Sequence, residues 1–198
     1  MLDNILIHYQ QLYALILIIY LIFNNKKPIL NWIIAFLIFI VFNLLTILLL
    51  IYFQFKIWYF HPISRFLLPP YTSITYFISY TYFHFYKEFI WSLMGGFFAF
   101  LIMLITNNIF NKTLFYPDEF IKVPILSSFL TFPFNFLFFI SGLFLILIIQ
   151  LFNLVKDKKM IKEKVSIKDF WVFIALFFII FNIYFKMNPP KLFFEFMP

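Results

Sequence analysis

The positions of this 198-residue chain that could form a binding site gather between Trp91 and Asn135. Gly95 and Gly96 stand side by side there and are two of only three glycines in the chain. Each glycine inside a helix costs roughly 1 kcal/mol relative to alanine, so a pair is expected where the backbone closely approaches another helix or a ligand. The pair therefore predicts either close helix packing or a lipid-contacting site.

A carboxylate pair and a carboxamide follow in the same stretch. Asp118 and Glu119 are the only adjacent acidic residues in the chain, and they come directly after Pro117. Acidic residues behind a proline favour a helix N-terminus, where they interact favourably with the helix dipole. Asn135 follows Asp118 by seventeen residues. Helix capping and ligand binding both remain open for the acidic pair.

Several kinds of chemistry are excluded by what the chain lacks. There is no cysteine, which excludes disulfides, thiolate metal sites, cysteine nucleophiles and a lipidated cysteine anchor. The histidines His8, His61 and His84 show neither HxxxH nor HExxH spacing, so neither a metal site nor a cofactor is expected. The formal charge is +7, and the basic residues are most concentrated in one loop, which indicates membrane topology rather than a nucleic-acid partner.

The composition requires a membrane. The chain is 65% hydrophobic and 12% charged, whereas soluble domains are about 45–50% apolar and about 25% charged. Such a chain cannot cover a surface that faces water, so the bilayer must be its solvent. At about 20 residues per span, we expect an all-α, polytopic bundle of six or seven transmembrane helices that forms a single integral membrane domain over residues 1–198.

The expected spans follow from the apolar runs and the residues that interrupt them. The loop 156–169 carries six of the 15 Lys and Arg residues, which places it on the cytoplasmic side. Pro133 and Asn135 interrupt the long run before that loop, and irregular backbone at membrane depth must be buried in protein or line a cavity. We therefore expect a break near Pro133 and a cavity near Asn135. The predicted spans are 4–23, 29–55, 71–86, 89–106, a broken segment 123–155, and 170–185.

A few polar residues lie inside these apolar spans. His8, Gln10 and Gln11 lie within about one turn of one another, so they would meet the headgroups or a polar cavity. Asn31 and Asn43 interrupt the second span, where we favour a hydrogen bond between helices over a ligand contact.

The order of motifs resembles that of the bacterial prolipoprotein diacylglyceryl transferases. These integral enzymes move a diacylglyceryl group from phosphatidylglycerol to the lipobox cysteine of preprolipoproteins. In that family a glycine pair opens a span, a short basic hairpin follows, and an acidic motif precedes an Asn-Phe pair by about seventeen residues. Gly95-Gly96, Asp118 to Pro124, and Asn135-Phe136 have this order here, and the similarity covers roughly residues 85–186.

The resemblance implies a phospholipid site without the usual chemistry. It implies Gly95, Gly96, Asp118 and Asn135 as substrate-binding residues, but it assigns no catalytic residue. The family's histidine before the glycine pair is Met94 here, and its arginine falls at Phe132. The arginine expected in the last span is absent as well; the polar residue there is Asn182. Activating a thiol and stabilising an oxyanion require a base and cations, which Met and Phe cannot supply.

Three functions follow as expectations. The first is a diverged relative of these transferases that binds phospholipid and, if active, transfers diacylglyceryl to the cysteine of a lipoprotein precursor. The second is a non-enzymatic structural subunit of a membrane complex with a protein partner. The third is a small transporter, which is weakest because no acidic residue lies in the middle of a span. We expect a multi-pass protein of the plasma membrane, with an organelle inner membrane as the alternative.

Overall fold

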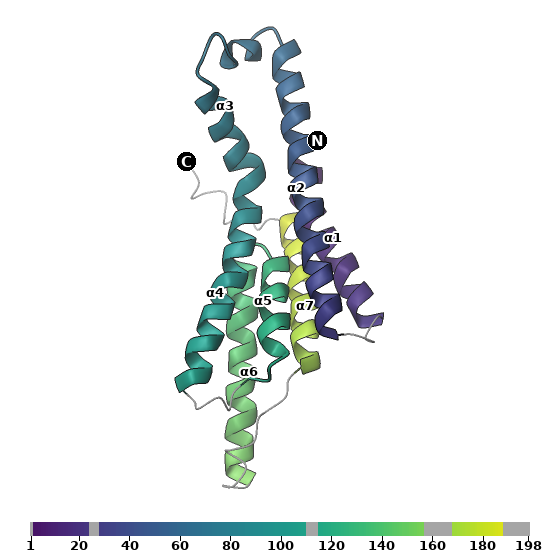
Figure 1. The fold of residues 1–198 in the computed structure, drawn as a ribbon, viewed down its shortest axis with the longest axis vertical. Helices are drawn as coiled ribbons and strands as arrows, with labels where there is room; N and C mark the ends of the chain where they lie inside the picture. The colour runs from purple at the N-terminus through teal and green to yellow at the C-terminus, as the bar shows by residue number, and fades with distance from the viewer. Residues whose placement is uncertain (1, 24–27, 110–114, 157–167, 188–198) are drawn as a thin grey trace.

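The computed structural model describes residues 2–23, 28–109, 115–156 and 168–187, and every element in these ranges is helical (Figure 1). The all-α prediction is confirmed for this part of the chain. The π-helical turn η2 joins α3 directly to α4. The elements are α1 (Leu2–Phe23), α2 (Pro28–Phe60), η1 (Ser64–Leu67), α3 (Ile74–Thr81), η2 (Tyr82–Tyr86), α4 (Lys87–Ile109), α5 (Glu119–Phe129), α6 (Phe134–Lys156) and α7 (Lys168–Met187).

Three helices in the described ranges are long and apolar enough to cross a membrane: Ile29–Phe60, Ile74–Ile109 and Phe134–Phe152. The apolar parts of α1 and α7, Tyr9–Phe23 and Phe170–Tyr184, are shorter. The described residues thus contain fewer such helices than the six or seven spans predicted.

One reason is that the predicted spans 71–86 and 89–106 belong to a single helix. Lys87 and Glu88 lie between the two predicted spans, but both residue types are good helix formers and neither interrupts the helix. The helix therefore continues through the charged pair from Ile74 to Ile109. Most of the lysine-rich loop 156–169, which carried the topology prediction, lies outside the described residues.

The predicted break near Pro133 is present. The helix α5 ends at Phe129, Leu130 is extended, and α6 begins at Phe134 after a cis Phe132–Pro133 peptide. Figure 1 shows α5 and α6 joined at their upper ends and running side by side, so α5 leads into the bundle and α6 leads back out. With 11 residues, α5 is only about 16 Å long and cannot cross a bilayer.

The other helices pack around α5. Its residues from Ile125 to Phe129 are all buried, whereas α2 buries one narrow face and exposes apolar side chains on the rest of its surface. The buried face of α2 repeats every three or four residues, as expected for one stripe of a helix. That stripe consists of Trp32, Ala35, Phe39, Asn43 and Ile47.

Beyond the bundle, the upper half of α2 and the α3–η2 segment form a long hairpin (Figure 1). We call residues 52–86 the aromatic hairpin. A small core of its own holds it together, in which Trp58 is buried against Phe77, with ring centroids 5.4 Å apart, and against Tyr80, at 4.7 Å. Tyr59 and Phe60 remain exposed on its outer surface.

Candidate functional site

The structure brings Gly95 and Asn135 together. The Asn135 side chain donates from Nδ2 to the carbonyl oxygen of Trp91 in α4, at 3.2 Å. A Cβ atom at Gly95 would collide with the carboxamide of Asn135. Gly95 therefore provides the space that the Asn135 side chain occupies, and this space is filled by protein.

Gly96 plays the same role one position further along α4. A Cβ atom there would meet the Ser128 side chain and, at 2.7 Å, the carbonyl oxygen of Pro124. The Ser128 hydroxyl donates to that same carbonyl at 2.9 Å. The glycine pair thus allows α5 to lie directly against α4, which favours close helix packing as the role of the pair.

The structure does not bring Asp118 to this place. Asp118 lies at the start of α5, at the opposite end from Asn135, and pairs with Lys122 at 3.2 Å. Glu119 is buried and accepts the backbone N–H of Tyr116 through Oε2 at 2.8 Å. Three of the four predicted binding residues therefore converge, while the acidic pair shapes the beginning of α5. Ligand binding by any of the four stays a prediction.

A set of uncharged polar side chains, which we call the polar layer, surrounds the junction of α5 and α6. Gln10 in α1 donates to the Ser92 hydroxyl at 2.7 Å, and that hydroxyl donates to the carbonyl oxygen of Leu130, also at 2.7 Å. Each of these side chains is at most 3% exposed. The polar layer consists of Gln10, Gln11, Ser92, Thr131, Asn135 and Asn182.

Thr131 is the second centre of the polar layer. Its hydroxyl oxygen accepts hydrogen bonds from Gln11 Nε2 at 3.3 Å and from Asn182 Nδ2 at 2.7 Å. The helices α1 and α7 are thereby tied to the junction. None of the six residues of the layer carries a charge, so the layer can bind a neutral polar group but offers neither a general base nor a cation.

Sequence reasoning identified part of this layer. Gln10 and Gln11 were expected at headgroups or a polar cavity; both are buried, and their carboxamides donate to side chains outside α1. Asn43 is fully buried as well, but its Nδ2 donates to the Phe39 carbonyl of its own helix at 2.7 Å instead of to another helix. Ser92 and Thr131 were missed. The signal that could have found Thr131 is its position two residues before the predicted break.

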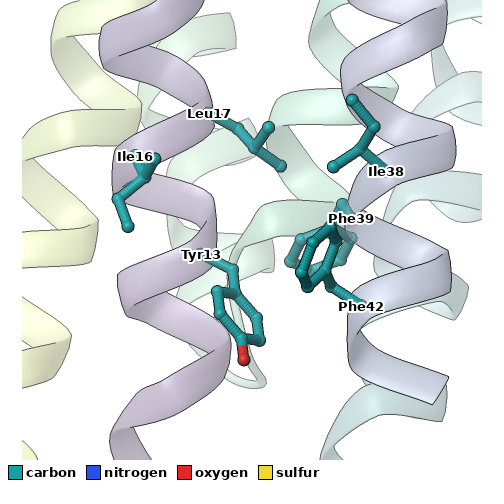
Figure 2. Close-up of a pocket in the computed structure, with 6 residues that line it drawn as sticks. All are labelled: Tyr13, Ile16, Leu17, Ile38, Phe39 and Phe42. Carbon is teal, nitrogen blue, oxygen red and sulfur yellow. The ribbon is translucent and has the colours of Figure 1, made fainter. Parts of the chain in front are cut away.

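An apolar groove lies between α1 and α2 (Figure 2). Its volume is about 210 Å³, and its six lining residues are Tyr13, Ile16, Leu17, Ile38, Phe39 and Phe42. Phe39 is fully buried and its ring lies 4.8 Å from that of Phe129 in α5. Ile16 and Phe42 are at least half exposed, so the groove opens sideways. Sequence reasoning missed this groove, because an apolar helix surface carries no mark of a gap.

A polar pair lies beside this groove. The Thr46 hydroxyl donates its single hydrogen to the carbonyl of Phe42 in its own helix at 2.8 Å. The Tyr13 hydroxyl, 3.3 Å from that of Thr46, is therefore the donor of the pair. The groove therefore combines an apolar channel with hydroxyl groups at its border.

Comparison with known proteins adds nothing to this geometry: no protein-family model, curated protein or solved structure matches the chain. The similarity to the diacylglyceryl transferases therefore rests on the order and spacing of motifs alone.

Proposed function

We propose that the protein is a multi-pass integral membrane protein that binds a phospholipid by an acyl chain and does not transfer the diacylglyceryl group of that lipid. The observation that carries this proposal is the groove between α1 and α2. Its lining is apolar apart from one tyrosine, and it opens toward the side of the bundle. In a bilayer that side faces lipid tails.

The size of the groove fits part of an acyl chain. A volume of about 210 Å³ is roughly seven times the ~30 Å³ that one water molecule occupies in the liquid. An apolar chain seated there would contact Leu17 and Phe39, which are both buried. The hydroxyl oxygen of Tyr13, whose hydrogen goes to Thr46, could then accept a hydrogen bond from a polar part of the same lipid.

The surroundings of the glycine pair argue against transfer chemistry. Met94 and Phe132, which stand where the resemblance expects a histidine and an arginine, are 40% and 56% exposed. The space beside Gly95 is filled by Asn135, and Asp118 lies at the far end of α5. A transferase needs a base and cations at one site. Lipid binding without transfer therefore agrees better with this geometry.

Native mass spectrometry in mild detergent tests the proposal. The change Ile38→Phe enlarges a groove residue, and Ile34→Phe is its matched control one turn away, since these isoleucines are 38% and 40% exposed. We expect a phospholipid adduct on the wild type and on Ile34→Phe, and loss of that adduct from Ile38→Phe. An adduct that survives Ile38→Phe contradicts the groove, and one lost only from Asn135→Ala indicates a site at the glycine pair.

A structural subunit is the second candidate, because the aromatic hairpin exposes large apolar side chains. Tyr59 is 61% exposed and Phe60 is 76% exposed. Aromatic residues are enriched in the buried centres of protein–protein interfaces. A protein chain that remains bound in the same mass spectra, and that is lost when both residues are replaced by serine, supports this second function.

A further inference from the structure

Two buried carboxamides in the polar layer converge on one hydroxyl. Gln11 Nε2 and Asn182 Nδ2 both donate to Thr131 Oγ1, and all three residues are fully buried. The oxygens of these carboxamides, Gln11 Oε1 and Asn182 Oδ1, accept no hydrogen bond from any described residue. Each unpartnered oxygen thus belongs to a carboxamide that is itself hydrogen-bonded to the Thr131 hydroxyl.

Turning the carboxamides over does not supply hydrogen-bond partners for all of their buried atoms. The assignment of oxygen and nitrogen in Gln and Asn depends on the hydrogen-bond network, so each group could be turned over. Thr131 has a single hydroxyl hydrogen, which can serve one carboxamide oxygen at most. At least one buried polar atom would still lack a partner, and such an atom carries a substantial desolvation cost.

We infer that this place binds one water molecule. Its two hydrogens would be donated to Gln11 Oε1 and Asn182 Oδ1, and its oxygen would accept the hydroxyl hydrogen of Thr131. All three protein groups are then satisfied at once. Three hydrogen bonds are the usual number for a water molecule buried in a protein. The bound water links α1 and α7 to the junction of α5 and α6.

The site favours a neutral ligand over a monovalent cation. None of the six residues of the polar layer is charged, so a cation would have no counter-charge there. The C-terminus of α5 has the negative end of its dipole at this junction, but the N-terminus of α6 brings a positive end to the same place. The two helix ends offset each other, which leaves hydrogen bonding as the basis of recognition.

A crystal structure of the full chain in a lipidic phase, at a resolution that shows ordered water, tests the inference. We expect one density peak in the wild type at hydrogen-bond distance, about 2.5–3.0 Å, from both Gln11 Oε1 and Asn182 Oδ1. The variant Thr131→Ser keeps the hydroxyl and should keep the peak. Its counterpart Thr131→Val removes the third partner and should lose the peak.

Other outcomes overturn the inference. A wild-type map with ordered side chains and no peak excludes the water, as does a map in which protein donors reach both oxygens. Crystals soaked in thallous ion provide a further check, because an anomalous peak at this place would identify a monovalent cation. The wild-type map and the soak decide the question even if neither Thr131 variant folds.

Discussion

Adding one methyl group at Gly95 tests the packing on which the candidate site depends. In Gly95→Ala the new Cβ would collide with the Nδ2 atom of Asn135 and would lie 2.6 Å from its Cγ and 3.0 Å from its Cβ. The Asn135 side chain would have to move, and its hydrogen bond to the Trp91 carbonyl would be lost. The variant should therefore be less stable than the wild type.

The expected loss can be estimated from three contributions. Overpacking a close contact costs about 1–3 kcal/mol, and losing one hydrogen bond costs about 1 kcal/mol. The better helix propensity of alanine returns roughly 1 kcal/mol. The net destabilisation is then about 1–3 kcal/mol, measured as a lower free energy of unfolding by denaturation in detergent with tryptophan fluorescence as the probe.

A double-mutant cycle separates this contact from other effects of the methyl group. Asn135→Ala removes the two atoms that the new Cβ meets most closely, so Gly95→Ala/Asn135→Ala should be about as stable as Asn135→Ala alone. Gly96→Ala serves as a contrast, because it meets the Pro124 carbonyl, a backbone group that no side-chain change removes. Wild-type stability of Gly95→Ala would refute the packing described here.

Two further substitutions are predicted to lower the free energy of unfolding by different amounts. Gly142→Ala would drive a Cβ into the indole of Trp171, a ring that is buried beside Phe138, so thermal unfolding should reveal a loss of about 1–3 kcal/mol. Lys122→Gln removes one i,i+4 ion pair and keeps a hydrogen-bond donor on the same side chain, so the same measurement should show a loss below about 1 kcal/mol.

Local rules were sufficient to predict the helical character and the break near Pro133. Apolar runs that lack charge can be satisfied in a bilayer only as helices, and a proline cannot continue a helix because it has no N–H to donate. Both rules depend on residues that are neighbours in the chain. They hold whatever the rest of the fold does.

The number of membrane spans was overestimated because a pair of charged residues was taken to separate two helices. Lys87 and Glu88 are polar, but a helix continues through charged residues as easily as through apolar ones. The burial of Trp58 could not be predicted from its neighbours in the chain, because Phe77 and Tyr80, which bury it, come from the other arm of the hairpin.

Asp118 shows why spacing alone cannot define a site. Its distance of seventeen residues from Asn135 matches the spacing that the resemblance requires. The helix α5 lies between the two residues and carries Asp118 away by about 1.5 Å per residue. Gly95 and Asn135 meet because α6 turns back beside α4 after the break. The number of residues between them does not predict this change of direction.

The polar layer is what the break near Pro133 demands from the rest of the chain. A junction between two helices leaves backbone groups without helical partners, and each unsatisfied group costs several kcal/mol where no water is available. Ser92 serves the Leu130 carbonyl from 38 residues away, and Gln11 reaches Thr131 across 120 residues. Partners so far apart in the sequence can be identified only in the folded structure. There they explain why side chains with carboxamide groups occur inside apolar helices. The carboxamide oxygens of Gln11 and Asn182 are not needed to satisfy the junction, and no donor among the described residues reaches them. For this reason they indicate a bound molecule in addition to a structural contact.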